Sequence, residues 1–215
     1  MSGATGSTRG RIQASGIILA AGRSSRMEGR HKLLRDLQGV PVIRRVAATA
    51  KDAGLHPVVV VTRTDGAEVR SALAGLDLLF STVSSVREGR LVSAVSGIET
   101  VLKADPGSVG AMVLLGDEPG VGGHHVAAVY AAAGRPAAPS RARYADREGH
   151  PVYVPAEFLR LLPDLARGRR PESRLWDILL ERCGPCRLAT FPEAAPIDID
   201  TVEDLARARE RRLVD

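Results

Sequence analysis

The order of apolar runs along the chain constrains its fold most. Between residues 15 and 134, short apolar runs alternate with stretches that have the 3.6-residue period of an amphipathic helix. The apolar runs lie at 15–21, 56–62, 76–82 and 110–120, the last ending in a polar turn, and the helical stretches lie at 41–54, 65–75, 90–104 and 123–134. This alternation predicts an α/β protein with a doubly wound, mostly parallel sheet and helices on both of its faces.

The expected elements carry their own boundary signals. Pro41 begins one helix and Gly54 ends it, and Asp65 is expected to cap the next helix. The second half is less regular, with a short strand at 150–155, two short helices, and a strand running into a C-terminal helix over 195–212. We find no internal repeat and no long linker. We therefore expect a flexible tail over 1–14 and a single domain over 15–215.

Composition excludes several classes of function. Aromatic residues make up 3% of the 215 residues, and basic residues do not repeat at helical spacing. Both facts argue against a nucleic-acid-binding protein. The net charge of +5 instead favours a small anionic ligand, although 27 of the 30 basic side chains are arginine, which reflects a compositional bias. The chain has neither an apolar run of membrane-spanning length nor a hydrophobic signal core, so we expect a cytoplasmic protein.

Several conspicuous residues are interpreted as structural. The sequence CGPC at 183–186 has the spacing of a redox pair, but a predicted helix precedes it, where a redox motif requires a strand before it and a helix after it. We therefore expect a turn that carries two thiols. His124 and His125 begin a predicted helix, and Trp176, the single tryptophan, is expected to pack in the core or in a lid.

Polar stretches follow three of the predicted strands directly. They lie at 22–32, 116–119 and 198–201. In open parallel sheets, ligands bind beyond the carboxyl ends of the strands, where the N-termini of helices also point. We therefore expect these three stretches to meet at one edge of the sheet and to form the functional site.

The first polar stretch has the residues of an anion-binding loop. Gly22 allows backbone amides to approach a ligand closely, and Ser24 and Ser25 supply hydroxyl donors. Arg26 is suited to bidentate contact with phosphate, and Lys32 to a point contact on a phosphate whose charge grows during a reaction. The stretch matches neither the P-loop nor the dinucleotide-binding fingerprint. The alternative is an exposed loop that is merely rich in arginine.

The other two stretches carry carboxylates. Asp117 lies at the end of a strand and is interpreted as a Mg²⁺ ligand, since magnesium binds one or two carboxylates together with substrate phosphates. Asp198 and Asp200 are candidates for the second carboxylate, because alternate residues of a strand share one face. Thr201 is expected to cap the last helix with Asp204.

Five motifs occur in an order that resembles a known family. They are LAAGRSSRMEGRHKLL, EGRLVSAV, LLGDEP, GHPVYVP and DIDTVEDLA. Together they resemble the nucleotidyltransferases that complete the molybdenum cofactor, the cytidylyl- and guanylyltransferases of molybdopterin, over roughly residues 15 to 210. The resemblance implies the three-layer, Rossmann-like, mostly parallel sheet of the nucleotide-diphosphosugar transferases and a Mg²⁺ cofactor.

The resemblance also implies roles for individual residues. Arg26 and Lys32 would contact the phosphates and, with Asp117, form the catalytic set, whereas His150 would face the pterin-side substrate. Ala21 favours CTP, because the guanylyl branch tends to have glycine at this position. The predicted nucleotide-binding set is Leu19, Ala20, Ala21, Gly22, Ser24, Arg26, Lys32, Ser93 and Gly116. A structural surface role for His150 remains the alternative.

The sequence departs from the family pattern in its first motif. Glu28 adds one residue between Met27 and Lys32, and the chain contains no asparagine, so any family role of that residue must be filled differently. We expect a transferase that moves CMP from CTP, or GMP from GTP, onto the phosphate of molybdopterin. The alternatives are transfer to a sugar or polyol phosphate, and a non-catalytic nucleotide-binding chaperone of a molybdoenzyme. No covalent nucleophile is expected, since phosphoryl-type transfer needs mainly positioning and charge.

Overall fold

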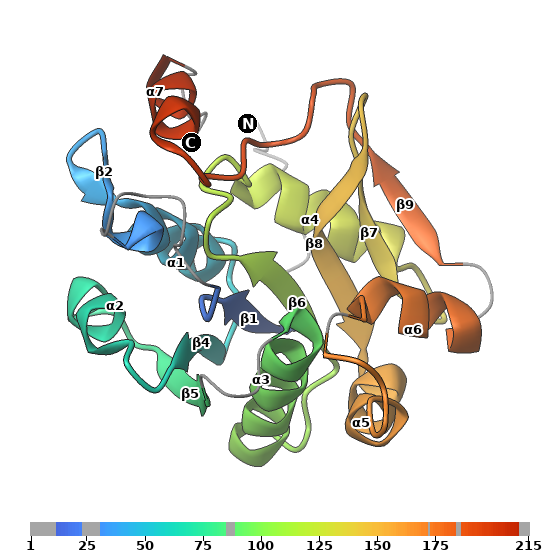
Figure 1. The fold of residues 1–215 in the computed structure, drawn as a ribbon. Helices are drawn as coiled ribbons and strands as arrows, with labels where there is room; N and C mark the ends of the chain where they lie inside the picture. The colour runs from blue at the N-terminus through green and yellow to red at the C-terminus, as the bar shows by residue number, and fades with distance from the viewer. Residues whose placement is uncertain (1–11, 23–30, 85–88, 172, 184–185, 211–215) are drawn as a thin grey trace, which may run out of the picture.

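The predicted apolar runs form the centre of a seven-stranded sheet. The computed structural model describes residues 12–22, 31–84, 89–171, 173–183 and 186–210. The sheet has the strand order β5-β4-β1-β6-β8-β7-β9 (Figure 1). Its four neighbouring parallel strands are β5 (Leu79–Val83), β4 (Val58–Arg63), β1 (Ser15–Leu19) and β6 (Gly110–Leu115).

The other half of the sheet contains its single antiparallel member. Strand β8 (Glu148–Pro155) is antiparallel both to β6 and to β7 (Ser140–Arg143), and β7 is parallel to β9 (Arg187–Thr190). The prediction of a mostly parallel sheet is confirmed. The sequence analysis missed β7 and β9, because SRAR and RLAT are short and carry arginine instead of a continuous apolar run.

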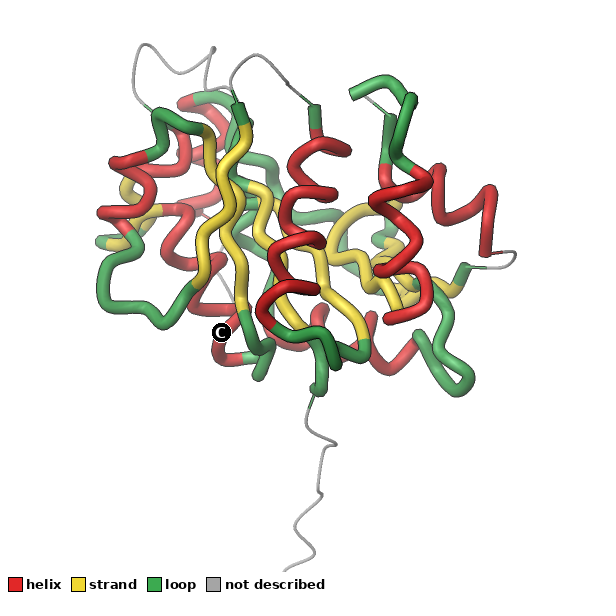
Figure 2. The backbone as a smooth tube through the Cα atoms, turned by 90° about the horizontal axis from the view of Figure 1, so that it is seen from below, coloured by secondary structure: helices red, strands yellow, loops and turns green. Residues whose placement is uncertain are grey.

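Helices cover both faces of the sheet, as Figure 2 shows from below. One face packs against α1 (Val42–Asp52), α2 (Ala67–Ala72) and α4 (Gly123–Ala132). The opposite face packs against α3 (Arg90–Ala104), α5 (Ala156–Leu165) and α6 (Leu175–Cys183). A 3₁₀ turn η1 (Lys32–Leu34), a hairpin of β2 (Asp36–Leu37) and β3 (Val40–Pro41), and α7 (Val202–Glu210) complete the described elements.

Alternation along the central strands builds two separate cores. In β1, Ile18 packs into the core under α1 and α4, and Ile17 packs into the core under α3. Val60 and Val59 of β4 divide in the same way. Burial of each such side chain contributes about 1.5–3 kcal/mol, which explains why these strands have no polar side. No described helix has the length and apolar character needed to cross a bilayer.

Two predictions about local structure are wrong. Asp65 does not cap α2, since Gly66 occupies the cap position and the Asp65 carboxylate pairs instead with Arg63. Residues 195–200 do not form a strand, because Pro196 lacks an amide donor and the segment crosses above the end of β6 (Figure 1), where Ile199 donates one backbone hydrogen bond to Asp117.

The predicted cap of the last helix is confirmed. The Asp204 amide donates to Thr201 Oγ1 at 3.1 Å, and the Thr201 amide donates to Asp204 Oδ2 at 2.8 Å. This reciprocal pair is a capping box. It fixes the chain immediately after Asp200.

Candidate functional site

The carboxyl ends of β1 and β6 meet at the point where the strand order reverses. From β1, the chain builds outward through β4 and β5 and then returns to β6 on the other side. The Gly116 amide donates to the Leu19 carbonyl at 3.0 Å, and a Cβ atom at Gly116 would lie 3.1 Å from that oxygen and 2.9 Å from Ile43 Cδ1. Glycine therefore permits the close approach of the two strand ends. A reversal of this kind is where open α/β sheets bind their ligands.

Lys32 joins two carboxylates at this edge of the sheet. Its Nζ lies 2.5 Å from Asp117 Oδ2 and 2.6 Å from Asp200 Oδ1. The Lys32 side chain is only 8% exposed, because buried Leu33 anchors η1 against the core. The side chains of Asp117 and Asp200 are 15% and 47% exposed, so the cluster opens toward solvent on the side of Asp200. All three predicted polar stretches thus contribute to one edge of the sheet.

The charges of this cluster fit an anionic ligand with a hard cation. Burial alone would lower the pKa of Lys32, but Asp117 and Asp200 outweigh that effect and raise the pKa above its ordinary value, so the ammonium stays charged. Two carboxylates that converge on one nitrogen offer the oxygen donors that Mg²⁺ prefers. The residues present therefore fit a divalent cation that would be held by Asp117 and Asp200.

Asp198 does not share the position of Asp200. Its Oδ1 lies 3.0 Å from Arg147 Nη2, and Arg147 also donates to the Pro196 carbonyl. Because residues 195–200 are not a strand, the two aspartates do not share one face. This corrects the prediction that Asp198 and Asp200 point to one face of a strand.

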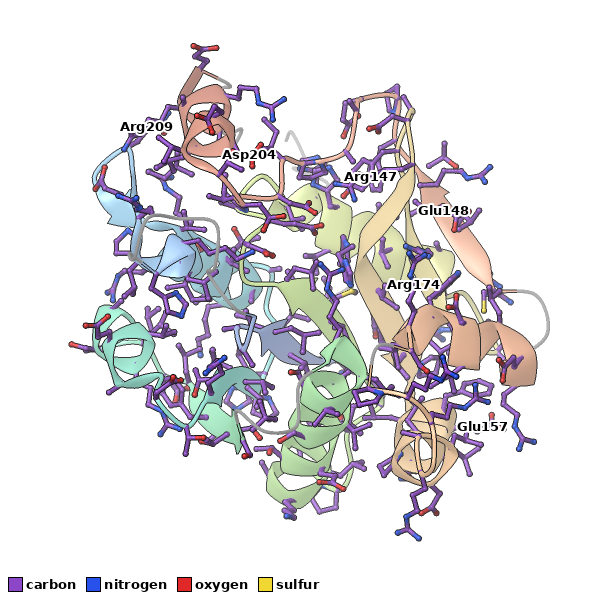
Figure 3. All side chains as sticks on the ribbon, in the orientation of Figure 1. Arg147, Glu148, Glu157, Arg174, Asp204 and Arg209 are labelled. Atoms are coloured by element: carbon purple, nitrogen blue, oxygen red, sulfur yellow. The ribbon has the colours of Figure 1, made fainter. Side chains whose placement is uncertain are left out.

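A cavity of about 660 Å³ lies next to the cluster, on the face of the sheet covered by α3 and α6. Four of its lining side chains are arginines that come from four separate segments, namely Arg90, Arg141, Arg147 and Arg174. Figure 3 shows Arg147, Glu148 and Arg174 on the side of the molecule that β7, β8 and α6 form. The apolar part of the lining includes Leu19 and Leu115, so the cavity begins at the strand ends that hold Asp117. The arrangement can hold an anion beside the Lys32 cluster.

His150 lines this cavity as a neutral ring. Burial, together with the guanidinium groups of Arg141, Arg90 and Arg147, lowers its pKa to about 3. Its Nδ1 lies 3.9 Å from Glu118 Oε2. At neutral pH, His150 is therefore available for hydrogen bonding and not as a cation.

The family follows from the sequence of the same segments. Residues 16–183 match the profile of the MobA-like NTP transferase domain. The chain belongs to this family. The predicted resemblance is confirmed, and the chain is a nucleotidyltransferase with the nucleotidyltransferase α/β fold.

Individual relatives of this MobA-like transferase agree with that assignment. A protein of Natronomonas pharaonis named "Probable molybdenum cofactor guanylyltransferase" is 29% identical over 205 residues, which cover 93% of this chain and 98% of the relative. The crystal structure of Rv0371c from Mycobacterium tuberculosis H37Rv superposes with a TM-score of 0.76 at 27% identity and covers 94% and 100% of the two chains. A nucleotidyl transferase from Methanothermobacter superposes with a TM-score of 0.72 at 26% identity, with 92% and 96% covered.

The structure describes some of the remaining predicted site residues and not others. Leu19, Ala20, Ala21 and Gly22 follow one another at the end of β1, with Gly22 exposed. Ser93 lies in the first turn of α3, where its hydroxyl donates to the Gly89 carbonyl at 3.3 Å. Ser24, Ser25, Arg26 and Glu28 lie outside the described residues. The roles of all these residues in nucleotide binding remain predictions.

Glu118 is a site residue that the sequence analysis missed. It lines the cavity and is 2% exposed, and its Oε2 has no hydrogen-bond partner among the described residues. Burial, followed by the nearby carboxyl groups of Asp198 and Asp117, raises its pKa well above the ordinary value. Two consecutive carboxylates directly after a buried strand were the available signal, and only the first of them was used.

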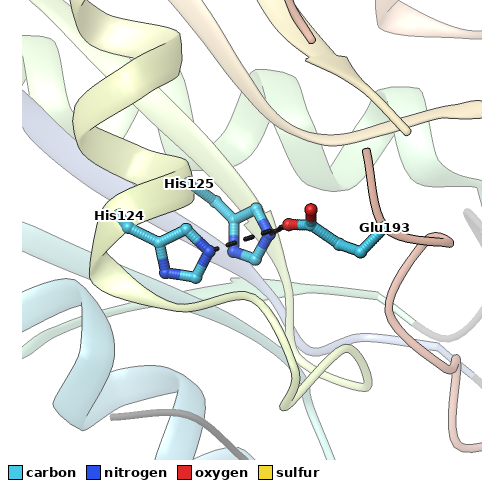
Figure 4. A group of neighbouring side chains, drawn as sticks. All are labelled: His124, His125 and Glu193. Atoms are coloured by element: carbon cyan, nitrogen blue, oxygen red, sulfur yellow. Dashed lines mark hydrogen bonds and ion pairs between the residues drawn. The ribbon is translucent and has the colours of Figure 1, made fainter. Parts of the chain in front are cut away.

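The group formed by His124, His125 and Glu193 is not built as a metal centre (Figure 4), although its ligand atoms lie within 4.8 Å of one another. The Gly122 amide donates to His125 Nδ1 at 3.0 Å, which leaves the ring proton on Nε2, and Nε2 contacts Glu193 Oε1 at 3.1 Å. A nitrogen that carries a proton cannot bind a metal. The group instead holds the start of α4 against the segment after β9.

The cysteine pair does not have the context of a redox motif. Cys183 ends α6, and Cys186 is a half-buried residue just before β9. Gly184 and Pro185 lie outside the described residues. The helix precedes the pair, as the sequence predicts, so the helix N-terminus that lowers a thiol pKa in redox motifs is not at the first cysteine.

Proposed function

We propose that this chain transfers a nucleoside monophosphate, CMP from CTP, onto the phosphate of molybdopterin and releases pyrophosphate. The observation that carries the proposal is the cluster of Lys32 with Asp117 and Asp200 beside a cavity lined by four arginines. A nucleotidyltransferase must bring two anions together, and this edge of the sheet offers a cationic place for each of them. The similarity to a relative named as a molybdenum cofactor guanylyltransferase supports the acceptor.

In the proposed reaction, a phosphate oxygen of the acceptor attacks the α-phosphorus of the nucleotide. The new P–O bond forms as the bond between the α-phosphorus and the bridging oxygen breaks, and pyrophosphate leaves with the electron pair. The acceptor phosphate is already ionised near neutral pH, so the protein need not remove a proton. Catalysis then depends on positioning and on stabilising the charge that develops.

Lys32 has the central role in this mechanism. Binding of the triphosphate replaces one or both carboxylate contacts of its ammonium with phosphate oxygens. The charged ammonium then stabilises the negative charge that builds on the α-phosphate and on the leaving pyrophosphate. Arg26, together with Gly22, Ser24 and the neighbouring loop residues, is proposed to contact the triphosphate.

Asp117 and Asp200 are proposed to hold Mg²⁺, with Asp198 acting on the acceptor side through Arg147. When bound, the cation supplies charge neutralisation between the nucleotide and acceptor phosphates. The release of Lys32 from the two carboxylates frees their oxygens for this role. His150, as a neutral ring in the cavity, is proposed to hydrogen-bond the acceptor.

The choice of nucleotide is open to a direct test. Ala21 favours CTP, whereas the name of the N. pharaonis relative favours GTP. The purified chain should release pyrophosphate with Mg²⁺, molybdopterin and CTP, and more slowly with GTP. Faster release with GTP would make the chain a guanylyltransferase. Release of pyrophosphate with a sugar or polyol phosphate but not with molybdopterin would show that the acceptor is such a phosphate. No release with any of the four nucleotides would favour a chaperone that delivers cofactor to a molybdoenzyme.

A further inference from the structure

The guanidinium group of Arg141 lies over the ring of Trp176 in the wall of the cavity. The guanidinium carbon of Arg141, on β7, lies 4.7 Å from the centroid of the Trp176 ring, on α6. Both residues line the cavity, and their side chains are largely buried, with Trp176 8% exposed and the Arg141 side chain 15% exposed. A buried arginine over a tryptophan ring presents one face to the ring and the opposite face to whatever lies beyond it.

The guanidinium group of Arg141 is fixed in orientation by its edge. Its Nε donates to the Gly149 carbonyl at 3.3 Å, and its Nη1 lies 3.4 Å from Glu148 Oε2. Two of its three nitrogens are therefore engaged by other groups of the protein. The part of the guanidinium group that is left for a ligand is chiefly its flat face. Because the group is already held in place, a ligand that stacks on it loses little of the binding free energy to ordering.

Two other arginines of the cavity are more exposed than Arg141. Arg90 begins α3, Arg174 directly precedes α6, and both are exposed. They are suited to contact the phosphate of an acceptor from solvent. Leu19, Val113 and Val152 give the same cavity an apolar surface. The cavity thus combines exposed cations with a flat, buried, cationic face and an apolar wall.

We propose that Arg141 is a specificity-determining residue: its guanidinium plane, supported by Trp176, is the surface on which a flat nitrogen heterocycle of the acceptor stacks. This inference rests on the proposed function, since it concerns the acceptor half of the same site. It excludes flexible sugar and polyol phosphates as preferred acceptors, because they have no flat face to use this surface.

The single tryptophan makes the proposal measurable in the full-length chain. Trp176 is the only source of tryptophan fluorescence, and it lines the cavity. The probe is 6-carboxypterin, a flat anion that quenches tryptophan emission when it binds nearby, and glycerol 3-phosphate is the anion without a ring. Dissociation constants are measured by calorimetry, and Trp176 emission reports the place of binding.

Three variants distinguish the effect of the flat guanidinium group of Arg141 from the effect of its charge. Arg141→Lys keeps the charge and loses the plane, and it should weaken 6-carboxypterin binding about tenfold while changing glycerol 3-phosphate binding by no more than about twofold. Arg141→Gln keeps a flat group without charge and should bind 6-carboxypterin better than Arg141→Lys does. Arg143→Lys is the matched control, since Arg143 lies on the same strand and pairs with the same Glu148 but does not line the cavity. It should leave both dissociation constants unchanged.

The proposal is overturned if Arg141→Lys binds 6-carboxypterin as tightly as the wild type, if it weakens both probes equally, or if the wild type does not bind 6-carboxypterin. Thermal unfolding of each variant detects loss of the fold. Pyrophosphate release is measured separately. If the chain shows this binding pattern but releases no pyrophosphate, the proposed stacking surface stands and the proposed transfer reaction is wrong.

Discussion

Lys32 precedes Asp117 by 85 positions in the sequence, yet its Nζ lies 2.5 Å from Asp117 Oδ2. The contact joins the turn after the first polar loop to the end of β6. It brings together two of the residues that the sequence predicts for the site. The proposed mechanism depends on this contact being exchanged for contacts with the nucleotide.

Lys32→Ala should lower the rate of pyrophosphate release by about 10²–10³, because one preorganised charge is lost where negative charge develops. Steady-state rates at saturating nucleotide measure the effect. Lys51→Ala is the matched control, since Lys51 also pairs with an aspartate, Asp77 at 3.2 Å, but on the exposed surface. A Lys32→Ala enzyme with the activity of Lys51→Ala would remove Lys32 from the reaction.

Asp117→Asn should abolish the Mg²⁺ dependence of nucleotide binding, and Asp200→Asn should weaken it less. Asp117 is the more buried of the two carboxylates, and its backbone carbonyl is held by the Ile199 amide, so it is the more rigid ligand. Calorimetric titration of the nucleotide with and without Mg²⁺ measures both effects. Unchanged Mg²⁺ dependence in both variants would show that the cation binds elsewhere.

Glu118→Gln should flatten the pH dependence of stability. The pKa of Glu118 is raised in the folded state. At a pH between its ordinary pKa of about 4.5 and the raised pKa, Glu118 is therefore ionised in the unfolded chain and protonated in the folded chain. Stability from this group is therefore complete at low pH and is lost as the pH rises, by at most about 1.4 kcal/mol per pH unit. Urea unfolding from pH 5 to 8 measures the slope.

Glu157→Gln, on the exposed surface of α5, serves as the comparison for this slope. It should leave the pH dependence as it is in the wild type. Equal slopes for the wild type and Glu118→Gln would mean that Glu118 ionises alike in the folded and unfolded chains.

Gly89→Ala should destabilise the chain by about 1–3 kcal/mol. Gly89 has φ +145° before α3, and a Cβ atom there would lie 2.1 Å from the Pro171 carbonyl oxygen. The substitution should also separate α3 from the segment before α6, and so enlarge the cavity. Gly123→Ala is the control, since a Cβ atom at Gly123 meets nothing within 4 Å at the start of α4. Thermal unfolding distinguishes the two variants, and equal melting temperatures would contradict this account.

The parallel half of the fold was predictable because its strands are buried on both faces. β4 and β6 are continuous apolar runs, and such runs have few alternative structures. β7 and β9 were not predictable in the same way, since both are four residues long and carry arginine, and β9 pairs with β7 across the helices α5 and α6 that separate them in the sequence.

The nucleotide side of the site was more predictable than the acceptor side. Asp117 follows the end of β6, and Lys32 ends the polar stretch that follows β1, and the positions of both strands in the sheet are clear from the sequence. The cavity instead draws Arg90, Arg141, Arg147 and Arg174 from four segments, and in a chain with 27 arginines none of these stands out. Only the fold shows which of them converge.

The capping box at the start of α7 has a consequence for the far end of the chain. Asp204 holds the amides of both Asp200 and Thr201, and Arg209 of the same helix donates to the Asp36 carbonyl in β2. The helix α7 thus connects the segment of Asp200, a proposed metal ligand, to the hairpin that follows Lys32. A chain that ended before Val202 would keep every described strand of the large sheet. Its Asp200 would lose the backbone hydrogen bond to Asp204 that holds it near Lys32.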